Sequence, residues 1–168
     1  IRFRGIKQIN GNIGYDASVY EEQIIPDTWV WGDIGNPDLL AADLKDKYNV
    51  ALEDLLNVRT FLDHNRIWET PKISEPLYNS SSTGAYASNG KRINNNLISE
   101  SLKQHLNKWT PHIKKFGLLL IELHTVKPEL VAKHLGETAA TAYDLTHGYS
   151  DQYILEVDAF LKAAEEAG

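Results

Sequence analysis

The sequence predicts an α/β protein with a doubly wound, mostly parallel sheet, on the strength of two observations. Apolar runs typical of strands, such as Gly117–Leu123, alternate with stretches whose apolar residues recur at three- and four-residue spacing, as in a helix with one buried face. Polar side chains follow several of the strand-like runs. Strands separated by helices form parallel sheets, whose ligands bind beyond the carboxyl ends of the strands.

Composition narrows the class of protein. The chain has 168 residues, 42% of them hydrophobic, which is ordinary for one globular domain. A net charge of −6 without clustered Lys and Arg argues against nucleic-acid or anionic-membrane binding. No apolar run approaches the roughly 20 residues of a membrane-spanning helix. We therefore expect a soluble, cytoplasmic protein.

Two residue types are absent from the chain. Without cysteine there is no disulfide framework and no thiolate metal site, so a metal would be held by nitrogen and oxygen ligands. The chain also lacks methionine, which indicates a fragment of a longer protein.

The first third of the chain predicts alternating strands and helices. In order, the expected elements are a strand that ends at Asp16, a helix over Ala17–Gln23, a strand over Trp29–Trp31 that ends at Asp33, and a helix over Pro37–Tyr48. The last helix has Asn36 or Asp38 near its N-cap.

The middle of the chain predicts a buried strand from Leu55 to Phe61, followed by the polar cluster Leu62–Arg66. Residues Glu69–Arg92 contain several Ser and Gly without sustained periodicity, so we expect a long loop or lid. Ile93–Trp109 is expected to be helical, with Leu97, Ile98, Leu102 and Leu106 on one face.

The last third begins with the clearest strand, Gly117–Leu123, which reads as a central parallel strand and has Glu122 and His124 at its end. Pro128–Leu135 predicts a short helix. From Tyr153 onward the spacing predicts a final helix, with Ser150 as N-cap and Asp151 in its first turn. Its expected buried face comprises Ile154, Val157, Phe160, Leu161 and Ala164.

His147 and Gln152 precede that helix, across a turn that contains Gly148. They could converge on one cation and leave coordination positions open to water and substrate. The alternative is that His147 is a hydrogen-bonded capping or packing residue.

The polar residues at the predicted strand ends are the candidate site of such a sheet. They are Asp16, Asp33, His64, Glu122 and His124. For Asp16 and Asp33 the alternative is a turn or cap role, and for each histidine it is a structural role.

The motifs GYD, WGDIGNPDLL, LLNVRTFLDHNR and GLLLIELHT, in this order, resemble a class I S-adenosylmethionine-dependent methyltransferase. The resemblance implies a Rossmann-like methyltransferase sheet, incomplete at both ends. It also implies that Asp16 binds the ribose hydroxyls of the donor and that Asp33 reaches the adenine, with Ile34 beside the base. The glycine-rich turn that should cradle the methionine end of the donor is not found before Asp16.

More specifically, NVRTFLDHNR, LIELH and YDLTHGYSDQYILEVDAFL resemble the metal-dependent C-methyltransferase domains of polyketide synthase loading modules, the apratoxin type. The resemblance implies one partial methyltransferase domain over residues 1–168, with a lid or loop at about 69–92. It implies S-adenosylmethionine and a mononuclear iron or manganese ion as cofactors. Its expected metal ligands are His147, Gln152 and, as third, Glu122, with His124 and His64 as substitutes.

The substrate implied by the resemblance is a malonyl group on acyl carrier protein, within a synthase whose other domains are neighbours. The metal would chelate the malonyl oxygens and stabilise the enolate that attacks the sulfonium methyl group. His64 or His124 would take the proton, and Arg59 or Arg66 would hold a carboxylate. The alternatives are a metal-free O- or N-methyltransferase and a non-catalytic scaffold domain of the same fold.

Overall fold

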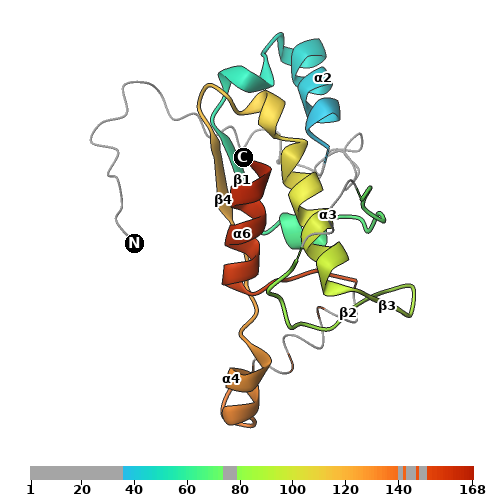
Figure 1. The fold of residues 1–168 in the computed structure, drawn as a ribbon. Helices are drawn as coiled ribbons and strands as arrows, with labels where there is room; N and C mark the ends of the chain where they lie inside the picture. The colour runs from blue at the N-terminus through green and yellow to red at the C-terminus, as the bar shows by residue number, and fades with distance from the viewer. Residues whose placement is uncertain (1–35, 74–78, 140–141, 143–146, 148–150) are drawn as a thin grey trace, which may run out of the picture. The chain divides into compact units, whose positions relative to one another are not determined.

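The computed structural model describes residues 36–73, 79–139, 142, 147 and 151–168, all within the compact unit Trp31–Gly168. The predicted elements before Asn36, and with them Asp16, Asp33 and Ile34, lie outside the described residues. The described helices and strands are α2 (Pro37–Tyr48), β1 (Asn57–Thr60), β2 (Tyr86–Ser88), β3 (Lys91–Ile93), α3 (Asn95–Asn107), β4 (Leu118–Ile121), α4 (Pro128–Lys133) and α6 (Val157–Ala167) (Figure 1). Three short 3-10 turns join them, η2 (Leu52–Asp54), η3 (Asp63–Asn65) and η4 (Thr110–His112). Within this part of the chain, no helix has the length and apolar character needed to cross a membrane.

Strands β1 and β4 pair in parallel, with Asn57 opposite Leu118 and Thr60 opposite Ile121. This pairing confirms that the two predicted strands are parallel, and the structure adds that they are direct neighbours although they are far apart in sequence. Among the described residues the sheet has two strands, and β2 and β3 form a separate antiparallel pair. The mixed helix and strand content fits a methyltransferase-like α/β fold, and the wider doubly wound sheet remains a prediction.

The core lies between α3 and α6, which pack on each other and beside the parallel sheet (Figure 1). Ile98, Leu102 and Leu106 of α3 are buried, as the periodicity predicts. Phe160 of α6 packs among them, and the small side chains Ala159, Ala163 and Ala167 let the two helices approach. Burying each large side chain contributes about 1.5–3 kcal/mol, so this contact is a main source of stability for the described unit.

Helix α2 matches its prediction at both ends. The Asn36 side chain accepts from the backbone N–H groups of Asp38 and Leu39, and Pro37 occupies the first turn. Asn49 ends the helix in the left-handed conformation, with φ 55°. The cap residues and the proline are local signals, which is why the sequence alone predicted both ends of this helix.

The prediction of one continuous loop or lid over Glu69–Arg92 is wrong at its end. Tyr86–Ser88 and Lys91–Ile93 form a hairpin whose turn, Asn89-Gly90, has φ of 50° and 72°. An Asn-Gly pair between two short strands is a recognised hairpin signal, and it was present in the sequence.

The predicted start of the last helix is also wrong. Helix α6 begins at Val157 with Glu156 at the N-cap position, and the proposed cap Ser150 lies outside the described residues. Asp151 has a left-handed φ of 55° rather than a helical one. Val157 and Leu161, predicted to be buried, are 46% and 59% exposed.

The reason is that Tyr153–Leu155 runs as a buried, extended segment along the ends of the parallel strands. The Tyr153 N–H donates to the His64 carbonyl at 2.8 Å, and the Thr125 N–H donates to the Leu155 carbonyl at 3.2 Å. Thr125 and Glu156 form an isolated parallel bridge. Hydrogen bonds to distant parts of the chain thus outweigh the local helical periodicity.

A central strand is covered on both faces. The described residues cover only one face of strand β4. Leu120 packs against the core, whereas Leu119 and Ile121 are exposed. Val58 of β1 is exposed as well. The described sheet therefore buries one face.

Glu156 fixes the segment before the hairpin to the start of α6. Its buried carboxylate accepts from the Ser82 hydroxyl at 2.6 Å and from the Thr83 N–H and hydroxyl at 2.8 and 2.9 Å. Burial raises the pKa of Glu156, but the hydrogen bonds from Ser82 and Thr83 outweigh it and the pKa is lowered overall. Residues 82–83 are therefore anchored rather than part of an open lid.

We predict that Glu156→Gln destabilises the fold at neutral pH by about 1–3 kcal/mol, because an amide has one acceptor oxygen for donors that now bind two, from Ser82 and from Thr83. A carboxylate whose pKa is lowered on folding stabilises above its ordinary pKa near 4.5, and the stabilisation is lost as the pH falls through the lowered value. Below that pH the free energy of unfolding should therefore fall less steeply in the variant than in the wild type. Urea denaturation across pH measures both effects. Glu165→Gln, at an exposed position of the same helix, is the matched control; an identical loss in that variant would contradict the role of Glu156.

Candidate functional site

His64 and Glu122 form a buried pair at the carboxyl ends of β1 and β4. His64 lies in η3, which follows β1, and Glu122 directly follows β4. His64 Nδ1 and Glu122 Oε1 are 2.6 Å apart, and the two side chains are 5% and 3% exposed. The parallel pairing of the strands brings these two predicted residues together, because it places both ends at one edge of the sheet.

The Glu122 carboxylate also holds the backbone of η3. Its Oε2 accepts from the N–H groups of Asp63 and His64 at 2.7 and 3.0 Å, and its Oε1 accepts from the Leu123 N–H at 2.7 Å. Burial raises the pKa of Glu122, but the hydrogen bonds from His64 and from these backbone groups outweigh it and lower the pKa overall. The ionised Glu122 accepts a hydrogen bond from the Nδ1–H of His64, which leaves the lone pair of the imidazole on Nε2.

His147 and Gln152 lie beside the same turn. The rings of His64 and His147 meet edge to face, with centroids 6.1 Å apart. The Gln152 N–H donates to the His147 carbonyl at 3.0 Å, and its side-chain amide donates to the Asn65 side chain. The structure thus gathers His147, Gln152 and Glu122, the three predicted metal ligands, around His64.

Their donor atoms fit the predicted metal only in part. Among the described residues, no three His, Cys, Asp or Glu side chains form a cluster that could hold a metal ion. Both oxygens of Glu122 already accept hydrogen bonds, so this carboxylate supports His64 and is not offered as a ligand. His147 supplies an imidazole, and the bond from Gln152 to Asn65 does not use the Gln152 carboxamide oxygen.

A second buried network supports η3 from the side of α3. Asp63 Oδ1 lies 2.9 Å from Arg59 Nε and 2.9 Å from His105 Nε2. Burial raises the pKa of Asp63, but His105 and Arg59 outweigh it and lower the pKa overall, while burial lowers the pKa of His105. Asp63 is therefore the charged partner of Arg59, and His105 is neutral.

The network assigns Arg59 a structural position. Its guanidinium lies over the Trp109 ring at 4.5 Å, and the residue is buried. This placement does not support the prediction that Arg59 holds a substrate carboxylate. Sequence reading missed Asp63 and His105 as its partners, although Asp63 directly precedes His64 in the polar cluster.

Arg66, the other residue predicted to hold a substrate carboxylate, also makes its hydrogen bonds within the protein. It donates to the carbonyls of Asp63 at 2.9 Å and Ile98 at 3.2 Å, and to the Ser101 hydroxyl at 3.3 Å. Burial lowers the pKa of Arg66 to about 10, where the side chain remains charged at neutral pH. Arg66 thereby ties η3 to α3.

His124 faces a different neighbour from His64. Its ring meets Phe160 of α6 edge to face, with centroids 5.0 Å apart. Its Nδ1 is buried and has no hydrogen-bond partner within the described ranges. Of the two predicted proton acceptors, His64 is therefore the one that Glu122 orients.

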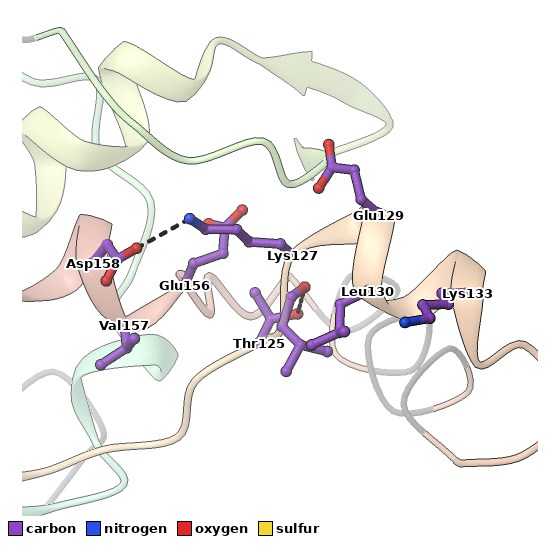
Figure 2. A pocket seen from close by; sticks show the side chains of 9 residues that line it. Thr125, Lys127, Glu129, Leu130, Lys133, Glu156, Val157 and Asp158 are labelled. Carbon is purple, nitrogen blue, oxygen red and sulfur yellow. Dashed lines mark hydrogen bonds and ion pairs between the residues drawn. The ribbon is translucent and has the colours of Figure 1, made fainter.

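A groove opens beside this edge of the sheet, between the segment Thr125–Lys133 and the start of α6 (Figure 2). No sequence pattern indicates this groove, because its two walls are separated in the chain. The lining side chains belong to Thr125, Val126, Lys127, Glu129, Leu130, Lys133, Glu156, Val157 and Asp158.

Comparison with known sequences places the chain in a family. A search of curated proteins finds no match. Residues 16–168, which are most of the chain, match a methyltransferase family model described as an AprA MT2-like domain. The chain therefore belongs to the AprA MT2-like methyltransferase family, and so resembles the C-methyltransferase domains of apratoxin-type polyketide synthases.

Proposed function

We propose that this methyltransferase moves a methyl group from S-adenosylmethionine to the carbon of a malonyl-type acyl group on acyl carrier protein, with His64 as the base. Family membership supports methyl transfer and the donor. The observation that supports His64 as the base is its pairing with Glu122 at the ends of β1 and β4. Neighbouring synthase domains and a cytoplasmic location belong to the same proposal.

The proposed chemistry needs one base and one methyl donor. His64 Nε2 takes the proton from the carbon between the thioester and the carboxylate, which leaves an enolate. That carbon attacks the sulfonium methyl group, so a C–C bond forms while the S–CH₃ bond breaks and the donor leaves as a thioether. Glu122 keeps the imidazole oriented and offsets its positive charge while it holds the proton.

The proposal also includes a metal ion near His64. His147 and Gln152 would hold an iron or manganese ion and leave positions open to substrate. When bound, such an ion supplies Lewis-acid polarisation of the malonyl oxygens. The lone pairs of Glu122 are engaged, so this proposal does not use it as the third ligand.

A metal-free O- or N-methyltransferase is the second candidate. It is favoured by the saturated carboxylate of Glu122 and by the lack of a three-residue His, Cys, Asp or Glu cluster in the part of the chain that the structure describes. In that case His64 deprotonates a hydroxyl or an amine, and the donor chemistry is unchanged. Titration with S-adenosylmethionine separates both candidates from a scaffold domain, which would show no binding.

We predict that His64→Asn lowers the rate of methyl transfer about 10²- to 10⁴-fold, because the general base is lost while an amide can still donate to Glu122. The assay follows label from methyl-labelled S-adenosylmethionine to malonyl acyl carrier protein, with donor affinity measured by calorimetry. His134→Asn, at an exposed histidine, is the matched control and should retain full activity. Full activity in His64→Asn would exclude the proposed base.

We expect Glu122→Gln to lower kcat at least about tenfold with a smaller change in KM, because Glu122 acts through His64 and does not touch substrate. Glu122→Asp restores the charge and should recover part of kcat. Such a recovery would show that the loss in Glu122→Gln comes from the orientation of His64 rather than from a loss of packing. Circular dichroism checks that each variant is folded, and Glu53→Gln at an exposed position is the control. An unchanged kcat would show that Glu122 only caps the turn.

The metal prediction concerns His147→Ala and Gln152→Ala. Each should abolish the bound metal and methyl transfer without unfolding the protein, because both residues are half-buried and lie outside the apolar core between α3 and α6. Elemental analysis and an X-ray fluorescence scan measure the metal directly. Full activity of chelator-treated wild type would reject metal assistance and favour the metal-free candidate.

A further inference from the structure

Gln152 bridges the two segments that carry His64 and His147. Its backbone N–H donates to the His147 carbonyl at 3.0 Å, and its side-chain amide donates to Asn65, the residue after His64. The rings of His64 and His147 themselves meet edge to face. Gln152 and Asn65 are both half-buried, so neither is sealed inside the core. Asn65 therefore contacts a predicted metal ligand without being one itself.

A backbone carbonyl sets the direction of the hydrogen bond between Gln152 and Asn65. Asn65 Nδ2 donates to the Phe61 carbonyl at 3.4 Å. A carbonyl oxygen only accepts, so the NH₂ end of the Asn65 carboxamide faces Phe61 and its oxygen faces Gln152. That oxygen also only accepts, so Gln152 presents its own NH₂ to it. The donor and acceptor ends are thus fixed in order from Phe61 through Asn65 to Gln152.

This order leaves the oxygen of the Gln152 carboxamide for a ligand. Within the described part of the chain, no group donates to that oxygen. A carboxamide oxygen binds a cation, whereas the NH₂ end of the same group has no lone pair to offer one. His64 is oriented in the same sense, because its Nδ1–H donates to Glu122 and its lone pair remains on Nε2. Without Asn65 the Gln152 carboxamide could present either of its ends.

We propose that Asn65 is a positioning residue that acts through Gln152 and turns the Gln152 carboxamide oxygen toward a cation beside His147. The inference rests on the metal-assisted form of the proposed function and adds a residue that supports a ligand without touching the metal. Residues that orient metal ligands through a hydrogen bond typically contribute about 10- to 100-fold to metal affinity. Glu122 has a different task, because it orients His64.

The test measures binding of Mn²⁺ alone by calorimetry, on the metal-stripped full protein that contains this chain. Asn65→Leu and Asn65→Ala remove the acceptor for the Gln152 NH₂, and each should raise the Kd of Mn²⁺ about 10- to 100-fold. Asn65→Asp keeps an acceptor and should bind Mn²⁺ at least as tightly as the wild type. Asn107→Leu, at the exposed end of α3, is the matched control and should leave the Kd unchanged.

The Gln152→Glu background separates positioning from a purely structural effect. A carboxylate has oxygen at both ends, so its orientation no longer matters to a cation. Asn65→Leu should therefore not weaken Mn²⁺ binding in this background. An equal rise in Kd in both backgrounds would show that Asn65 only supports the fold, and would overturn the inference.

These measurements need neither the methyl donor nor a substrate, so they are independent of methyl transfer. The expected series of Kd values supports the role of Asn65 even if no malonyl substrate is methylated. Three results overturn it: no Mn²⁺ binding by the wild type, wild-type affinity in Asn65→Leu, or a loss in Asn65→Asp as large as in Asn65→Leu. None of the three excludes metal-free methyl transfer with His64 as the base.

Discussion

The Glu122 carboxylate is the interaction on which the described site depends. Moving an ionised carboxylate out of water costs several kcal/mol unless hydrogen bonds replace its hydration. Here four donors replace it, three backbone N–H groups and the ring of His64. Because one of the joined segments follows β1 and the other follows β4, this carboxylate couples sheet pairing to the geometry of the turn. A change in strand register would break the site.

The same turn is supported from its other side by the charges of Asp63 and Arg66. Asp63 joins it to Arg59 of β1 and to His105 of α3, and Arg66 joins it to the α3 backbone. Both networks are buried, so removing one partner would leave an uncompensated charge. The His64 imidazole is thereby held on a turn whose side chains have little freedom, which is what the proposed role as a base requires.

The Tyr153–Glu156 segment connects the turn that carries His64 with the groove beside α4. It begins at the His64 carbonyl, passes the Thr125 N–H and ends at Glu156 in the groove wall. Glu156 in turn binds Ser82 and Thr83, so the loop before the hairpin is fixed to the same place.

The sequence by itself determined the elements that local signals specify. Helix α2 followed from Asn36 and Pro37, α3 from its apolar spacing, and β4 from its apolar run. It also placed His64 and Glu122 among the candidate residues at strand ends, whereas the pairing of these two side chains came from the structure. Only the tertiary structure decided that Tyr153–Leu155 is extended, that Arg59 is buried against Asp63, and that Glu122 is saturated by four donors. Each of these depends on hydrogen bonds or burial between segments distant in sequence, which local periodicity does not encode.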